Sequence, residues 1–316
     1  MNIRLPRLNH HFLLICQAAA TPASCGNLLL KPKKNLTMSK RNRSSGSREI
    51  ERRLAEGRGM GRGRHYLPWI EIHDVPSRGL STRMKSSLTG RTHHLLSQLE
   101  TDWLFAFHAM NNLVDVREQF PLLTVEETLE IANQLRVAHQ VDPKSKEPIV
   151  GTTDFLLTLR DGPREVNMAI AIKPSSDLAS PRVLEKLEIE RVYWAARKTD
   201  WRILTEQELP RAVVKNLRWV QPHIDLPESG AFAVHELDRI RTSMESAVRG
   251  GGQSLAELTI KCDDRLGLTP GASLCVVRHL IAAQLWLVDL TVEIDPRKPL
   301  QLIEKYEHPT DAKLAA

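Results

Sequence analysis

Three segments of the chain between residues 94 and 198 carry apolar side chains at a helical spacing. Residues 94–110 place apolar side chains three and four positions apart, which predicts an amphipathic helix. A second helix is predicted over residues 124–140, where Thr124 and Glu127 have the spacing of a capping box. A third is predicted over residues 180–198, which begin with a proline suited to a first helical turn.

Shorter apolar runs lie between these helices and predict strands. The run at 113–123 contains a short strand that ends at Pro121, and residues 152–174 form two runs around an Asp161-Gly162-Pro163 turn. A last strand is predicted at 200–205. The resulting order is helix, strand, helix, strand, strand, helix, strand, which predicts an α/β domain.

The character of the chain changes after Leu209, where helical patterns follow one another without strands between them. Gly267 separates two of these helices, and a hairpin is expected after the last helix, with strands at 285–295 and 300–306. Two helices joined by a glycine turn and followed by a hairpin predict a winged helix-turn-helix domain. The helices are predicted at residues 211–220, 231–248, 254–267 and 269–284.

Basic residues concentrate near the beginning of the chain. The net charge of all 316 residues is +6, yet residues 40–91 hold 13 basic against 5 acidic side chains, a local charge of +8. Such an excess suits a polyanion, most simply nucleic acid. An alternative is a solvated or disordered basic arm, which the charge alone does not separate from a binding segment.

The predicted domain layout has three parts. Residues 1–46 are a disordered or mis-annotated extension, because Met38 begins an ordinary start and residues 1–37 match a secretory signal poorly. Residues 47–208 form the α/β domain with its basic N-terminal segment, and residues 209–316 form the winged-helix domain.

Composition narrows the class of protein further. The sequence contains no apolar run near the roughly 20 residues that span a bilayer. Its four cysteines lack CxxC spacing, which favours free thiols over zinc ligands or disulfides. A cytoplasmic protein that contacts no membrane is therefore expected.

An acid opens the predicted hairpin and a base closes it. Counting back from the turn sets Asp161 opposite Val166 and Asp154 opposite Lys173. Because side chains alternate across a strand, Ala171 and Lys173 share a face. The pair alone fits a salt bridge at the rim of the sheet.

Glu100 adds a second carboxylate. It follows Leu99 on the amphipathic helix and lies at the margin of the buried stripe, where a carboxylate is costly unless something pairs with it. Two carboxylates and a lysine near the end of a sheet are what metal-assisted phosphodiester hydrolysis requires, since oxygen ligands hold Mg²⁺.

The motif of an Asp, a short hairpin and x-x-Lys resembles the PD-(D/E)xK nuclease core, which has a restriction-endonuclease-like fold. Six segments, from EGRGMGRGRHYLPW through TTDFLLTLRDGP and AIAIKP to LEKLEIERVYWAARKTDWRILTEQEL, are similar to the TnsA family. That family supplies the endonuclease subunit of Tn-seven-like heteromeric transposases. The resemblance covers about residues 47–209, and beyond them it agrees in architecture, because the family has a winged-helix C-terminal domain.

The resemblance implies a catalytic triad of Glu100, Asp154 and Lys173, with Mg²⁺ as cofactor and Mn²⁺ as its substitute. Glu100 and Asp154 would hold the metal. Relatives carry glutamine or glutamate two positions before the lysine, but here Ala171 offers no side-chain ligand. The backbone carbonyl of Ala171 or Ile172 is then the expected further metal contact.

Other polar residues are weaker candidates, each with a structural alternative. Glu190 matches another family acid and either supports the site or pairs with Lys186 one turn earlier. Gln119 and Arg117 alternate on a strand and touch phosphate or form a polar edge. His93 and His94 are expected at a helix start. The residues expected to bind DNA are Arg58, Arg62, Arg64, Arg117 and Arg278. The alternative for Arg278 is that its helix packs against the nuclease domain or a partner protein.

The resemblance implies a Mg²⁺-dependent DNA endonuclease that nicks the 5′ ends of a transposon during cut-and-paste transposition. Its expected partners are transposon-end DNA, a TnsB-type transposase and a TnsC-type AAA+ ATPase, in a bacterial, nucleoid-associated setting. Two alternatives stay open. One is a stand-alone PD-(D/E)xK nuclease, and the other is a catalytically inactive DNA-binding or scaffold subunit, which is suggested by Ala171.

Residues 1–37 are expected to be dispensable, because they show no periodic pattern that could join a core. A chain beginning at Met38 should have the thermal midpoint and the DNA-cleavage rate of the full chain. Loss of cleavage, or a midpoint several degrees lower, would assign a function to the extension.

Overall fold

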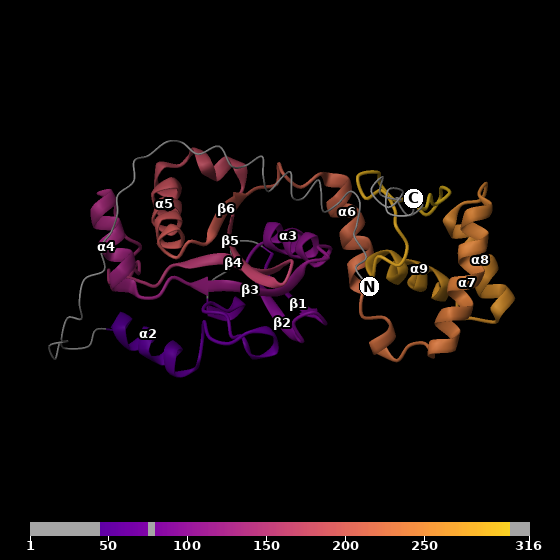
Figure 1. The fold of residues 1–316 in the computed structure, drawn as a ribbon, viewed down its shortest axis with the longest axis horizontal. Coiled ribbons are helices and arrows are strands. Elements are labelled where there is room, and N and C mark those ends of the chain that lie inside the picture. The colour runs from indigo at the N-terminus through magenta and orange to yellow at the C-terminus, as the bar shows by residue number, and fades with distance from the viewer. Residues whose placement is uncertain (1–44, 75–79, 304–316) are drawn as a thin grey trace, which may run out of the picture. The chain divides into compact units, whose positions relative to one another are not determined.

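The computed structural model describes residues 45–74 and 80–303, which form two compact units (Figure 1). The first unit contains the described residues up to Glu100 together with Asn112–Glu208, and the second contains Thr101–Asn111 and the chain from Leu209 onward. The boundary at residue 208 is the one expected from sequence, but the short segment 101–111 groups with the C-terminal unit. The proposed extension at residues 1–46 lies outside the described residues except for its last two.

A four-stranded mixed sheet is the centre of the first unit. Its strands lie in the order β3-β4-β5-β6, with β3, β4 and β5 antiparallel and β6 parallel to β5. The parallel connection passes through a helix, as a βαβ crossover requires. The strand bounds are β3 Leu113–Pro121, β4 Thr152–Asp161, β5 Arg164–Ile172 and β6 Asp200–Leu204.

Two helices cover one face of this sheet (Figure 1). They are α4 (Val125–Leu135) and α5 (Pro181–Ala196), and their apolar stripes meet the strands in one buried cluster. The Trp194 indole in this cluster donates a hydrogen bond to the Thr153 hydroxyl at 2.6 Å, so its polar edge is satisfied inside the core. The cluster is formed by Leu122, Ile131, Ala132, Leu156, Ala169, Ile189, Tyr193 and Trp194.

The capping box predicted at Thr124 and Glu127 does not form. Thr124 precedes α4, but its side chain makes no capping hydrogen bond. The Glu127 carboxylate instead pairs with the Arg197 guanidinium at 2.6 Å. A partner from beyond the end of α5 therefore replaces the local cap.

Sequence periodicity missed a two-stranded sheet formed by β1 (Thr82–Ser86) and β2 (Arg91–Leu95). Helix α3 consequently begins at Gln98, not at residue 94, and ends at His108. Local hydrogen bonds set this helix start. The Ser97 hydroxyl accepts the Glu100 backbone N–H at 3.1 Å, and the Glu100 carboxylate accepts the Leu96 N–H at 2.9 Å. This is the reciprocal pattern of an S-x-x-E cap, which marks a helix start.

His93 and His94 lie on β2, so their placement at a helix start was wrong. His93 is fully buried, and its ring contacts the Glu118 carboxylate at 2.8 Å and the Thr89 hydroxyl at 2.9 Å. Arg91 reaches the same carboxylate through both terminal nitrogens, at 2.7 and 2.5 Å. Glu118 of β3 therefore fastens the small sheet to the large one, and its partners lower the pKa of this buried carboxyl to about 2 against the opposing effect of burial.

The hairpin register differs from the predicted one by two residues. Asp161 pairs with Arg164, and Phe155 pairs with Ile170, around a two-residue Gly162-Pro163 turn. Gly162 has φ 57°, a left-handed conformation that glycine adopts without steric cost. Because a slip of two residues preserves the alternation of faces, Asp154 and Lys173 remain on one side of the sheet despite the error.

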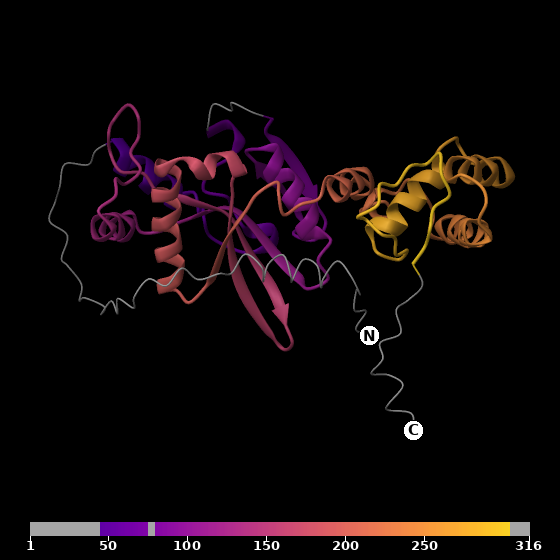
Figure 2. The ribbon, with the colours of Figure 1, turned by 90° about the horizontal axis from the view of Figure 1, so that it is seen from above.

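The chain from Leu209 onward is helical. Further short turns of 3₁₀ helix connect its elements (Figure 2). Gly267 ends α8 with φ 66°, as its place between two predicted helices implied. The main helices are α6 (Arg211–Val220), α7 (Val234–Gly250), α8 (Leu255–Leu266) and α9 (Ala272–Ala282).

The wing hairpin predicted after α9 is not present in the described residues, because residues 283–303 contain no strand, and residues 304–306 of the second expected strand lie outside the described residues. Backbone groups of this segment form hydrogen bonds with a side chain and not with a neighbouring strand. The Asn216 amide of α6 donates to the carbonyls of Leu290 and Val292, and its oxygen accepts the Ile294 N–H. The winged-helix assignment is therefore not supported by the fold of residues 209–303.

Glu118→Gln should lower the free energy of unfolding by about 3–5 kcal/mol, because it leaves the Arg91 charge buried without its carboxylate. The exposed Glu126→Gln is the matched control and should change stability little. Chemical denaturation at neutral pH measures both. The low folded pKa also predicts that the Glu118 contribution is complete above about pH 4.5 and is lost as pH falls toward 2. Equal stability of the two variants would contradict this role.

Candidate active site

The acid and the base of the hairpin meet at one end of the sheet. Asp154 lies near the start of β4, and Lys173 follows the last residue of β5. One oxygen of Asp154 accepts the Ile172 N–H and the Lys173 ammonium, each at 2.7 Å. The ammonium also donates to the Ile172 carbonyl at 2.9 Å. The structure therefore brings together the pair that the sequence placed on a common face.

Glu100 enters the same electrostatic environment from the first turn of α3. Its side chain is buried, and it accepts hydrogen bonds from the Leu96 N–H and the Ser97 hydroxyl, both at 2.9 Å. Burial and the neighbouring Asp154 carboxylate raise the pKa of Glu100 to about 7. A carboxyl with such a pKa lacks a full compensating charge, although it has hydrogen-bond donors.

Glu190 of α5 is a third acid beside Asp154. It is buried, and it accepts a hydrogen bond from the Trp201 indole at 2.9 Å. Burial and the Asp154 charge raise the pKa of Glu190 to about 7. Of the two readings left open by the sequence, the structure supports a place beside the site, because Glu190 points to Trp201 and forms no ion pair with Lys186 among the described residues.

Lys173 is the cation around which these acids gather. Burial disfavours its charge, but the attraction of Asp154, Glu190 and Glu100 is larger in sum and raises the pKa of Lys173. The ammonium is therefore charged near neutral pH. One half-buried lysine faces three carboxyl groups, so the cluster has an excess of negative charge whenever all three are ionised.

These oxygens fit a divalent cation. The Lys173 ammonium is itself a cation bound to the Asp154 carboxylate and the Ile172 carbonyl, which shows that the two oxygens converge on positive charge. The raised pKa of Glu100 shows that further positive charge would be favourable. Carboxylate and carbonyl oxygens are the ligands that Mg²⁺ prefers. Ala171 is fully buried, and the contact with the ammonium is made by the Ile172 carbonyl.

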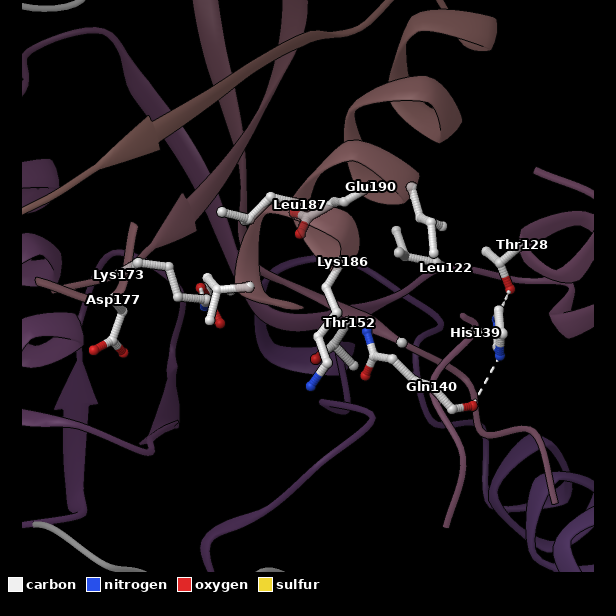
Figure 3. Close-up of a pocket in the computed structure, with 14 residues that line it drawn as sticks. Leu122, Thr128, His139, Gln140, Thr152, Lys173, Asp177, Lys186, Leu187 and Glu190 are labelled. Carbon is white, nitrogen blue, oxygen red and sulfur yellow. Dashed lines mark hydrogen bonds and ion pairs between the residues drawn. The ribbon is translucent and has the colours of Figure 1, made fainter. Parts of the chain in front are cut away.

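A pocket of about 330 Å³ opens beside Asp154 and Lys173 (Figure 3). Its apolar wall comes from α5 and from Leu122, and its polar wall includes Gln140, Thr152 and Lys186. His139 also lines it, but both ring nitrogens are engaged, with the Thr128 hydroxyl at 2.8 Å and the Gln140 carbonyl at 2.8 Å. That histidine is therefore held as a structural support.

Comparison with known proteins decides the family. The model for the TnsA-like endonuclease N-terminal domain matches residues 110–206, and the model for the TnsA endonuclease C-terminal domain matches residues 208–290. The chain is also 36% identical over 245 residues to the Transposon Tn7 transposition protein TnsA of Escherichia coli, covering 78% of this chain and 87% of that protein. The chain belongs to the TnsA family. The two matched segments meet at the boundary between the units of the fold.

Two of the five arginines expected to bind DNA in this TnsA-family protein are buried among other partners. Arg58 pairs with Asp74 at 2.5 Å and with Glu56 at 2.8 Å. Arg117 donates to Thr158 at 3.0 Å and lies over the Phe120 ring. The expectation for these two is corrected, because a guanidinium buried among such partners is not presented to a polyanion.

Arg278 is half-buried and is held by residues of its own unit. Its guanidinium lies 4.5 Å from the centre of the Trp219 ring and contacts the His223 ring at 3.1 Å. Arg64 is exposed, and Arg62 is exposed while paired with Glu165 at 2.8 Å. Of the five arginines, Arg62 and Arg64 are exposed, Arg278 is half-buried, and Arg58 and Arg117 are buried.

Gln119 fits its alternative of a satisfied polar edge and not a contact with phosphate, because it is almost fully buried. Its side-chain oxygen accepts the Thr152 hydroxyl at 2.9 Å, and its backbone carbonyl accepts the Trp69 N–H. Gln119 therefore fixes the start of β4 through Thr152, and its side chain does not face the solvent, where a phosphate would lie.

Sequence reasoning missed the groups that orient the acids. Ser97 holds Glu100, and Trp201 holds Glu190. The S-x-x-E spacing was available as a signal for Ser97, whereas Trp201 comes from β6 and has no local signal. Within residues 45–74 and 80–303, no helix is long and apolar enough to cross a membrane.

Another group of possible metal ligands lies at Glu71, His73 and Asp74, whose ligand atoms are within 4.8 Å of one another. Asp74 is already paired with Arg58 and Arg53. Two guanidinium groups therefore compensate its charge without an ion, whereas the single Lys173 ammonium serves Asp154, Glu100 and Glu190 together, and we assign no function to this group.

Glu190→Gln should stabilise the metal-free protein more at pH 8 than at pH 5.5. The pKa of about 7 means that folded Glu190 stays protonated while the unfolded carboxyl ionises, so its stabilising contribution falls as pH rises from about 4.5 to 7. An amide keeps an acceptor for Trp201 without the charge. Thermal unfolding in a chelator at the two pH values measures the effect, and an equal loss of stability at both would contradict it.

Proposed function

We propose that this protein is the metal-dependent DNA endonuclease subunit of a transposase, and that it nicks the 5′ ends of the transposon during cut-and-paste transposition. The observation that carries the proposal is the convergence of Asp154, Lys173 and Glu100 at one end of the sheet. Family membership supports endonuclease chemistry, and the excess of buried negative charge supports a bound cation.

Glu100, Asp154 and the Ile172 carbonyl would hold Mg²⁺, with Mn²⁺ as a substitute. When bound, Mg²⁺ polarises the scissile phosphate and stabilises the leaving oxygen. Ala171 supplies no carboxylate, so fewer protein charges hold the ion than in relatives with an acid there. We expect weak metal affinity without DNA, since Mg²⁺ gives up its water reluctantly.

Lys173 acts as a charged donor in this proposal. Its raised pKa keeps the ammonium protonated while Asp154 faces it, so it is suited to orient an attacking water or to neutralise charge on the phosphate. A protonated ammonium does not accept a proton. Proton removal from water therefore falls to another group or to solvent.

The proposed partners are transposon-end DNA, a TnsB-type transposase that cuts the other strand, and a TnsC-type AAA+ ATPase. The helical unit from Leu209 onward is the region proposed to recruit protein partners. Its fold supports this assignment indirectly, because Arg278, the residue expected to face DNA there, packs on Trp219.

An inactive scaffold is the second candidate, and Ala171 is the observation that favours it. The two functions differ in what Asp154 does. In a scaffold, the Asp154–Lys173 pair is a salt bridge that closes the end of the hairpin. In a nuclease, the same pair supports strand cleavage.

Asp154→Asn and Lys173→Ala should each reduce Mg²⁺-dependent strand cleavage by at least about 100-fold, since each removes a group placed at the reacting phosphate. DNA affinity should change little. Asp161→Asn, at the exposed tip of the same hairpin, is the matched control and should cut normally. The assay uses the full chain with a TnsB-type transposase and end-labelled transposon DNA. Normal cleavage by Asp154→Asn would refute the nuclease assignment.

A further inference from the structure

The pocket beside the active site contains a cation without a protein partner. Lys186 of α5 lines the pocket together with Asp154 and Lys173 (Figure 3). Its ammonium forms no ion pair or hydrogen bond with any residue of the described chain. The Gln140 side-chain amide lines the same pocket and likewise has no hydrogen-bond partner there. Two free donor groups therefore face one cavity.

The electrostatic surroundings of Lys186 favour an anion. Burial lowers the pKa of Lys186, and the neighbouring charges of Arg182 and Lys173 lower it further. Acids also line the pocket: Asp154 is paired with Lys173, Glu190 is turned toward Trp201, and Asp177 is exposed near Lys173. None of them pairs with Lys186, so an incoming anion would meet a cation that is still uncompensated.

The walls of this pocket are fixed before any ligand arrives. Arg182, one turn before Lys186 on α5, donates to the carbonyls of Ala138 and His139 at 2.5 and 3.0 Å. These bonds clamp the segment that carries Gln140 against the helix that carries Lys186. The His139 ring braces the same segment through the Gln140 carbonyl. Because the backbone that carries both donors is already fixed, binding an anion orders only the exposed Lys186 side chain and the Gln140 amide.

We propose that Lys186 and the Gln140 amide form a subsite for a non-bridging phosphate oxygen of the DNA strand, at a phosphate other than the one that is cut. This inference rests on the proposed nuclease function, which places the scissile phosphate at Asp154 and Lys173. The subsite lies along the same pocket, so the strand that is cut passes both. Its role is to position the strand, because neither group touches the reacting atoms.

Phosphodiester chemistry is favoured over a carboxylate ligand by the location of the pocket. The cavity is continuous with the residues proposed to hold the scissile phosphate, and a nucleic acid strand presents an anion at every nucleotide. A lysine acts toward phosphate as a point charge, and the amide adds a directed N–H donor.

The test pairs Lys186→Gln with single neutral phosphates in the substrate. Each phosphate near the cut is replaced in turn by methylphosphonate, and cleavage by the full chain with a TnsB-type transposase is measured. For the wild-type protein, one non-scissile position should slow cleavage about ten-fold, the loss expected for one charge-assisted hydrogen bond. Lys186→Gln should show the same loss on unmodified DNA and little further loss at that position.

A binding measurement keeps this test independent of cleavage. Lys186→Gln should reduce the salt dependence of DNA affinity by about one unit of slope, the change expected for one lost phosphate contact. The control is Lys198→Gln, which replaces an exposed lysine after the end of α5. In the cleavage assay described above, this variant should retain the wild-type methylphosphonate pattern.

The possible results separate the two proposals. If Lys186→Gln cuts normally, or stays sensitive to the same methylphosphonate position, or keeps the wild-type salt slope, the phosphate subsite is refuted while the nuclease function stands. If the wild-type protein does not cut but Lys186→Gln still lowers the salt slope, the subsite stands and the nuclease function fails.

Discussion

The site depends on one carboxylate oxygen. A single oxygen of Asp154 accepts both the Ile172 N–H and the Lys173 ammonium, and so fixes the end of β5 against the beginning of β4. The same charge raises the pKa of Glu100 and of Glu190 and holds the Lys173 ammonium in its charged state. Because three titrating groups respond to Asp154, this one side chain sets both the geometry and the charge of the pocket.

Two buried glutamates of the first unit show how partners decide the state of a carboxyl. Glu118 and Glu100 are both almost inaccessible to solvent. Glu118 faces the Arg91 guanidinium and the His93 ring, and its pKa falls to about 2, whereas Glu100 faces Asp154 and its pKa rises to about 7. Burial opposes ionisation at both sites, so the difference comes from the sign of the neighbouring charge. The Glu118 carboxylate stabilises the fold, and the Glu100 carboxyl lies where a bound cation would favour its ionised form.

Several arginines that a count of charges assigns to a polyanion form ion pairs inside the protein. The basic excess of residues 40–91 suggested a polyanion, yet Arg58 is used to hold the loop around Asp74, and Arg91 is used to hold Glu118. Arg62 and Arg64 remain exposed. In the pocket, the unpaired Lys186 is a single residue on an otherwise ordinary helix, and no count of charges would have singled it out.

The order of helices and strands from α3 to β6 was determined by the sequence alone, because apolar periodicity and turn residues are local. The common face of Asp154 and Lys173 was determined for the same reason, since a register error of two residues does not change the face of a strand. Only the tertiary structure decided which buried polar groups are satisfied, because Trp201, Arg91 and Asn216 reach their partners from other elements. It also decided against the wing hairpin within the described residues, since backbone groups that Asn216 already satisfies have no need of a second strand.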